Sequence, residues 1–173
     1  IAGEGDRRWY ASVILNRLMF VYFLQKKGFI DRGDLNYLQN RLAAMQRRAA
    51  DRYYRDFLLP LFFDGFALPP EQRSAQTHAL LGDVRYLNGG LFLRHAVEER
   101  WPRIAIPDVA FARLFALFER YSWNLDDSIG GADDEINPDV LGYIFEKYIN
   151  QKAFGAYYTP PEITRYLCAQ TVE

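Results

Sequence analysis

The sequence predicts a mainly α fold, a multi-helix bundle, and three observations support this. Apolar residues recur at spacings of three and four over most of the chain, which is typical of helices with one buried face. Half of the 173 residues are hydrophobic and 16% are aromatic, which is enough apolar surface for one real core. Residues that start and stop helices separate the apolar stretches. One compact unit built from several helices is therefore expected.

The first helix is expected from Arg8 to Lys27. Gly28 follows two lysines there, as is typical of a helix C-terminus. The apolar residues of its buried face recur at helical spacing: Val13, Ile14, Leu18, Met19, Tyr22 and Phe23.

Two more helices are expected before residue 64. Asp34 could cap the second, which could continue past Arg48. Its inner side would carry Leu35, Leu38, Leu42 and Met45. Residues 53–63 form the third segment, in which Pro60 is expected to bend or end the helix. Its packing residues would be Phe57, Leu58, Leu61 and Phe62.

The second half of the chain alternates turns and helices. Residues 75–80 suggest one or two helical turns, and residues 83–92 a rigid turn around Asn-Gly-Gly. Residues 109–121 resume helical spacing. Asn137-Pro138 has the cap and first residue of another helix, and residues 159–162, Thr-Pro-Pro-Glu, open a last helix with a capping box.

Composition limits the function. With 21 basic and 22 acidic residues the net charge is −1, so any contact with nucleic acid is expected to be local. One cysteine, Cys168, and two histidines are too few for an internal disulfide or a structural zinc site, so no metal is expected. Cys168 is expected to be a small packing residue. No stretch reaches the ~20 apolar residues of a membrane span. We expect a cytoplasmic protein without a membrane partner.

Arg48 and Arg52 are the candidate DNA-binding residues. They belong to an arginine-rich stretch that outnumbers its two aspartates, and a spacing of four would place them on one helical face. A track for DNA phosphates is one interpretation. An ordinary solvated helix surface is the other, and the near-neutral charge of the chain favours it.

Residues 155–163, Gly-Ala-Tyr-Tyr-Thr-Pro-Pro-Glu-Ile, are the strongest candidate for a ligand site. A helix N-terminus offers unpaired N–H groups and a partial positive charge, which suit a carboxylate. The Thr159 hydroxyl and the aromatic faces of Tyr157 and Tyr158 could complete a pocket with polar and apolar parts. From the residues alone, a capped helix with two buried tyrosines is the simpler interpretation.

The pattern Gly-x-x-Tyr-Thr-Pro-x-x-Ile resembles a motif of DNA amino-methyltransferases from type I and type IIG restriction systems and BREX-type phage defence. Residues 86–92 and 137–146 resemble parts of the helical region ahead of their catalytic core, and residues 17–24 resemble its opening helix. The blocks follow the family's order and together touch most of the chain. In those families the motif lines the pocket for the methionine part of S-adenosylmethionine. The resemblance implies that Tyr158, Thr159 and Pro160, with Tyr157 beside them, bind this cofactor.

The resemblance also implies a domain plan. Residues 1–152 would be a helical connector or scaffold, and residues 153–173 the start of a truncated α/β, S-adenosylmethionine-dependent methyltransferase domain. The glycine-rich cofactor loop and the catalytic Asn/Asp-Pro-Pro-aromatic tetrapeptide would lie after Glu173. No catalytic residue is therefore expected in this chain, and the chain alone is expected to show no methylation activity.

The parent protein implied by this resemblance is a site-specific DNA adenine-N6 methyltransferase of a restriction–modification or phage-defence system. It would act on double-stranded DNA, with an adenine removed from the stack before methyl transfer. Its partners would be the downstream methyltransferase core, with nuclease or specificity domains as further candidates. The alternative is a helical connector that docks another domain or subunit, in which the Tyr-Thr-Pro turn serves only as a hinge.

Overall fold

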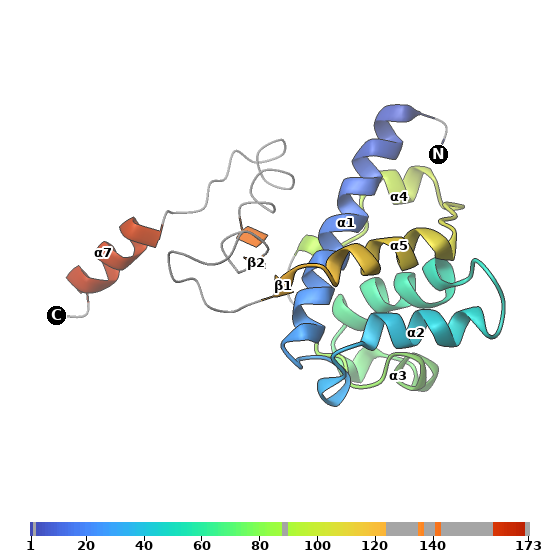
Figure 1. Ribbon diagram of the computed structural model, residues 1–173, viewed down its shortest axis with the longest axis horizontal. Coiled ribbons are helices and arrows are strands. Elements are labelled where there is room, and N and C mark those ends of the chain that lie inside the picture. Colours follow the sequence, from blue (N-terminus) through green and yellow to red (C-terminus); the bar gives the residue numbers. More distant parts are fainter. Residues whose placement is uncertain (2, 88–89, 124–134, 137–140, 143–160, 172–173) are drawn as a thin grey trace. The chain divides into compact units, whose positions relative to one another are not determined.

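The computed structural model describes residues 1, 3–87, 90–123, 135–136, 141–142 and 161–171. The described part is mainly helical, which confirms the predicted fold class (Figure 1). Two units can be separated, Ile1–Trp123 and Asn124–Glu173. The first unit contains α1 (Glu4–Lys26), α2 (Tyr37–Gln46), α3 (Ala75–Leu81), α4 (Ala96–Arg100), α5 (Asp108–Phe118) and β1 (Ser122–Trp123). The second contains β2 (Glu135–Ile136) and α7 (Pro161–Thr171).

Short helical turns connect the helices of the first unit. Three are 3-10 turns, η1 (Asp31–Gly33), η4 (Pro70–Gln72) and η5 (Gly90–Phe92). Two are π-helical, η2 (Tyr54–Leu58) and η3 (Leu61–Phe66). No helix in the described ranges is both long and apolar enough to cross a membrane.

The helix expected from Arg8 to Lys27 is confirmed as α1, which begins four residues earlier. Acidic residues in its first turn and Lys26 in its last complement the helix dipole. Gly28 takes a φ of +70°, and its N–H donates to the Gln25 carbonyl at 2.9 Å, so it ends the helix as expected. The buried face of α1 includes the predicted Ile14 and Tyr22, and also three polar residues: Asn16, Arg17 and Gln25.

The predicted start of the second helix is wrong. Asn36, and not Asp34, is the N-cap of α2, because the Asp34 carboxylate accepts the Asn36 N–H at 2.9 Å and holds the chain in a turn before the helix. Leu35 therefore lies outside the helix and is 51% exposed, although it was expected on the inner side. Leu38, Leu42 and Met45 are buried as predicted.

Pro60 does not end the third helical segment. Its φ and ψ of −55° and −42° are helical, and the chain stays helical to Phe66. Proline lacks the N–H that an α-helix would use, and wider turns surround it: Leu59 N donates to Tyr54 O, and Ala67 N to Phe62 O, each five residues back. The predicted packing residues of this segment are all buried.

The core of the first unit is largely aromatic and lies between α1, α2, η2, η3 and α5. The α5 helix confirms the helical spacing predicted for residues 109–121 as far as Phe118, where the helix ends, and its Phe111, Phe115 and Phe118 are buried. Phe118 meets Tyr22 of α1 edge-on at 5.0 Å between ring centroids, and Phe111 meets Tyr53 edge-on at 5.3 Å. Such edge contacts add to the burial of each ring and fix the helices against one another.

In the second unit, α7 lies within the helix predicted from residue 159 onward, but Thr159 itself is outside the described residues. The side chains of residues 162–171 are exposed. Cys168 is among them, so its predicted packing role is wrong for the described structure. The predicted helix start at Asn137-Pro138 also lies outside the described residues.

Candidate functional site

Arg48 and Arg52 both line one surface groove of about 370 Å³, which we call the Arg48–Arg52 groove. Its other lining residues are Met45, Ala49, Asp56 and Leu80. They come from the end of α2, from η2 and from α3. Two predicted DNA-binding residues thus share one concave surface.

The reason given for their proximity was nevertheless wrong. The second helix does not continue past Arg48, because α2 ends at Gln46 and Asp51 takes a left-handed φ of +58°. Arg48 and Arg52 therefore do not share a helical face. They instead lie on either side of residues 49–51, in the connection between α2 and η2.

Two aspartates hold this turn against the start of α5. The Asp108 carboxylate is buried and accepts the Asp51 and Tyr53 N–H groups, each at 3.1 Å. In return, the Asp51 carboxylate accepts the Asp108 N–H at 2.9 Å. Each side chain thus satisfies backbone donors at the other's helix start, where a negative charge is also favoured. We call this pair the Asp51–Asp108 clasp.

The charges in the groove are accessible. Arg52 donates to Asp56 at 2.7 Å, but their side chains are 45% and 35% exposed, and exposed pairs of this kind contribute only about 0–1 kcal/mol. Arg48 is exposed and has no carboxylate within 4 Å among the described residues. A phosphate could therefore replace Asp56 at Arg52 and engage Arg48 at little cost.

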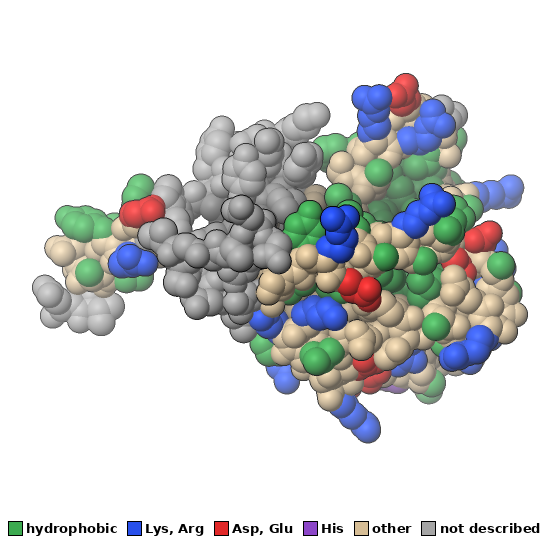
Figure 2. Space-filling model, in the orientation of Figure 1, with side chains coloured by type: hydrophobic (Ala, Val, Ile, Leu, Met, Phe, Trp, Pro, Cys, Tyr) green, Lys and Arg blue, Asp and Glu red, His purple; other side chains and the backbone are tan. Residues whose placement is uncertain are grey.

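Charge is unevenly divided along the chain, which the net value of −1 conceals. Residues 1–123 hold 18 basic and 13 acidic side chains, a formal charge of +5. Residues 124–173 hold 3 basic and 9 acidic side chains, a charge of −6. The first unit by itself is thus a basic helical unit, and basic side chains are spread over the face shown in Figure 2. The expectation that any contact with nucleic acid is local was based on the net charge of the whole chain alone.

A buried ion pair in the first unit was not found from the sequence. Arg17 of α1 donates to Glu98 of α4 at 2.6 Å, and their side chains are 1% and 4% exposed. The Tyr10 hydroxyl donates to the same carboxylate at 2.9 Å and also contacts the Tyr54 hydroxyl. The one sequence feature that pointed to this ion pair is Arg17 itself, an arginine within the apolar run of the first helix. Its partner lies 81 residues away, in a helix that was not predicted.

This cluster fixes the segment after residue 89. Arg17 donates to the carbonyls of Leu91 at 2.9 Å and Leu93 at 2.7 Å, and Phe92 between them packs on Phe66 with ring centroids 4.6 Å apart. Burial acts to raise the pKa of Glu98, but hydrogen bonds and charge from Arg17 outweigh it, so the pKa lies below its usual value. The cluster stabilises the fold, because all its donors and acceptors have partners.

His95 is the N-cap of α4, a role that was not predicted from the sequence. Its ring accepts the Val97 N–H at 3.2 Å, and its backbone N–H donates to Glu98 at 2.8 Å. This reciprocal capping box brings Glu98 to the position where it meets Arg17.

The predicted cofactor residues Tyr157, Tyr158, Thr159 and Pro160 lie outside the described residues. Within the ranges that are described, no three His, Cys, Asp or Glu side chains are grouped to hold a metal ion.

Comparison with known proteins finds one informative similarity. The chain is 35% identical to a Methanocaldococcus jannaschii protein named "putative type II restriction enzyme and methyltransferase". The match covers 98% of this chain and 15% of that relative's length. No protein-family model and no solved structure matches the chain.

The matched stretch includes both units. Since 98% of the chain is aligned, it contains the Arg48–Arg52 groove, the Arg17–Glu98 pair and the Tyr-Thr-Pro motif at residues 157–160. The similarity therefore extends over the whole helical unit and does not rest on one short motif.

Proposed function

We propose that this chain is the helical scaffold segment of a restriction–modification enzyme that methylates the N6 amino group of adenine in double-stranded DNA. Residues 1–152 form the scaffold, and residues 153–173 begin the methyltransferase domain. The Tyr157–Pro160 turn forms one wall of the S-adenosylmethionine pocket. The observation that carries this proposal is the 35% identity, over 98% of the chain, to a relative named as a restriction enzyme and methyltransferase.

Two further points support the proposal. The motif at residues 155–163 resembles the cofactor-lining element of DNA amino-methyltransferases. The described first unit is helical and basic, as expected of a scaffold beside DNA. S-adenosylmethionine would supply the methyl group, and this chain's own part would be to orient the cofactor's amino-acid end through the Thr159 hydroxyl.

Thr159→Ala tests the cofactor wall in the intact enzyme that we propose contains this chain. Loss of one hydroxyl contact to a charged ligand group should weaken S-adenosylmethionine binding about tenfold. Isothermal titration calorimetry measures the affinity. Thr159→Ser keeps the hydroxyl and should bind within about twofold of wild type. Equal affinity of all three proteins would instead favour the connector function, in which the turn is only a hinge.

We also propose that the Arg48–Arg52 groove contacts the DNA phosphate backbone. Two accessible arginines line one concave surface, and the planar N–H groups of arginine suit phosphate oxygens. The weak Arg52–Asp56 pair offers little competition. Contacts of this kind position DNA without reading its sequence.

The double variant Arg48→Glu, Arg52→Glu should weaken binding of this chain to a DNA duplex about a hundredfold at low salt, roughly one factor of ten for each arginine. Fluorescence anisotropy with a labelled duplex measures it. The slope of log affinity against log salt concentration should fall by about 0.9 for each lost contact.

Arg113→Glu, Arg120→Glu is a matched control, because it changes two exposed arginines on or beside α5 by the same charge. It should alter the affinity much less. Equal losses in the two double variants would show a diffuse charge effect, and absence of wild-type binding at low salt would contradict the groove proposal.

A further inference from the structure

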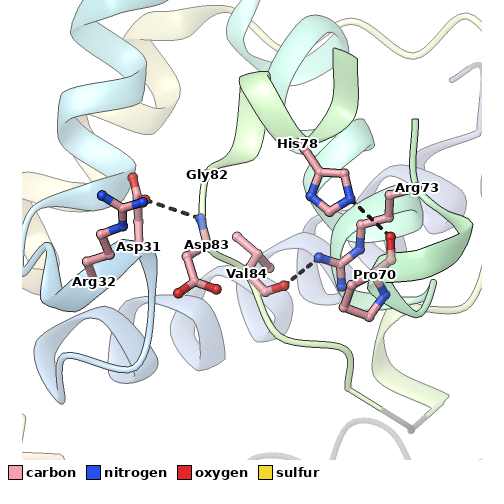
Figure 3. Close-up of a pocket in the computed structure, with 8 residues that line it drawn as sticks. All are labelled: Asp31, Arg32, Pro70, Arg73, His78, Gly82, Asp83 and Val84. Carbon is pink, nitrogen blue, oxygen red and sulfur yellow. Dashed lines mark hydrogen bonds between the residues drawn. The ribbon is translucent and has the colours of Figure 1, made fainter. Parts of the chain in front are cut away.

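A second cavity, of about 420 Å³, lies between the turn after α1 and the segment that carries η4 and α3 (Figure 3). Asp31 and Arg32 come from the turn, and Arg73 and His78 from the opposite wall, with Asp83 between them. This cavity shares no lining residue with the Arg48–Arg52 groove. It therefore requires its own explanation.

Arg73 is the unusual residue of the cavity. Its Nε donates to the Leu68 carbonyl at 3.0 Å and its Nη1 to the Val84 carbonyl, so the guanidinium is held in place by the backbone. Its Nη2 is buried and has no acceptor among the described residues. Burial lowers the pKa of Arg73, and no carboxylate lies within ion-pair distance in the described part of the chain. Arg73 as a whole is half-buried and lines the cavity, so its positive charge acts on an anion there, whereas the Nη2 atom itself is not accessible to one.

The cavity's carboxylates oppose an anion only in part. Asp31 is paired with Arg41 at 2.9 Å, and the same carboxylate accepts the Asp83 N–H at 3.2 Å, so its charge is largely compensated. Asp83 is exposed and carries the remaining negative charge. Against it stand Arg73 and the exposed Arg32, which leaves an excess of one positive charge among the residues that line the cavity. Glu71, which does not line it, offsets part of this excess through its charge on Arg73.

His78 adds a polar group of defined orientation. Its Nε2 lies 3.0 Å from the Pro70 carbonyl, which can only accept, so Nε2 carries the proton. Nδ1 is then the nitrogen available to a ligand: it accepts from a protonated oxygen, or donates when the ring is charged.

We propose that this cavity binds a phosphate group, with Arg73 and Arg32 as its cationic ligands. The planar N–H groups of arginine match phosphate oxygens, and Arg73 is already held in a fixed orientation by two backbone carbonyls. The volume falls in the range of about 300–1,000 Å³ usual for small-ligand sites, so a nucleoside attached to the phosphate also fits. The phosphate belongs either to a free nucleotide or to the DNA backbone.

The test is calorimetric titration of the 173-residue chain with inorganic phosphate at constant ionic strength. Arg32→Gln should weaken phosphate binding at least fivefold, and Asp83→Asn should strengthen it about threefold, because one removes a ligand and the other an opposing charge. Arg113→Gln, a single exposed arginine elsewhere, should leave the affinity unchanged. Arg32 makes no hydrogen bond to the Arg73 segment in the described structure, so its variant tests binding apart from folding.

Adenosine 5′-monophosphate and a DNA duplex, titrated in parallel, identify the source of the phosphate. Tighter binding of the nucleotide, reduced by Arg32→Gln, supports a free-nucleotide site. Duplex binding reduced by Arg32→Gln even when Arg48 and Arg52 are both glutamate supports a backbone contact. No phosphate binding, or equal binding by wild type and Arg32→Gln, overturns the proposal and leaves the Arg48–Arg52 groove untouched.

Discussion

Replacing Arg17 by methionine is expected to lower the free energy of unfolding by about 3–5 kcal/mol. The change leaves the Glu98 carboxylate buried without its cation, and an uncompensated buried charge costs far more than the pair itself contributes. It also removes the donors that satisfy the Leu91 and Leu93 carbonyls. Urea unfolding followed by circular dichroism measures the difference.

Adding Glu98→Gln to the Arg17→Met variant should recover about 1–2 kcal/mol, because the amide keeps an acceptor for Tyr10 without the buried charge. A double variant no more stable than the single one would contradict the buried-charge explanation.

Glu98→Gln alone should reduce the dependence of the free energy of unfolding on acidic pH. The folded pKa of Glu98 is lowered, so the stability that its carboxylate contributes is complete above the unfolded pKa of about 4.3 and is lost as pH falls through the folded value.

Helices that carry an apolar repeat could be predicted from the sequence because the information is local. In α1 and α5 the spacing of apolar residues marks the buried face directly, and Gly28 marks a helix end through its own backbone conformation. The short α4 helix was missed because it has no such repeat. It begins at a histidine cap, which is a weak local signal.

Features that depend on tertiary contacts could not be predicted. Pro60 lies within a helical segment because the wide turns of η2 and η3 accommodate its missing N–H, and they bury aromatic side chains on both sides. In the sequence Arg17 only interrupts an apolar run, and its role becomes clear from its ion pair with Glu98 in the structure. Pairing across 81 residues leaves no trace in local spacing.

The candidate sites also depend on tertiary contacts that local sequence does not reveal. Arg48 and Arg52 were selected by a helical spacing that the structure does not contain, yet they share a groove because the Asp51–Asp108 clasp turns the chain. The cavity lined by Arg32 and Arg73 was not predicted at all. Its lining residues come from two segments about 40 residues apart and show no motif.

Asp108→Ala is expected to lower the free energy of unfolding by about 2–4 kcal/mol. The Asp51 and Tyr53 N–H groups both lose their acceptor, and the Tyr53 donor is buried, where an unsatisfied N–H costs about 1–3 kcal/mol. Because the clasp closes the turn that carries Arg48 and Arg52, amide hydrogen exchange should also accelerate first at residues 47–53. Urea unfolding and exchange mass spectrometry measure the two effects.

Conservative changes at both ends of the clasp provide the controls. Asp108→Asn keeps one carbonyl oxygen and should lose about half as much stability as Asp108→Ala. Asp51→Asn keeps an acceptor for the Asp108 N–H at a position where asparagine also tolerates the left-handed φ of +58°, so it should remain within about 0.5–1 kcal/mol of wild type. If Asp51→Asn were as damaging as Asp108→Ala, the aspartate charges, and not the hydrogen bonds to the turn, would hold this part of the groove in place.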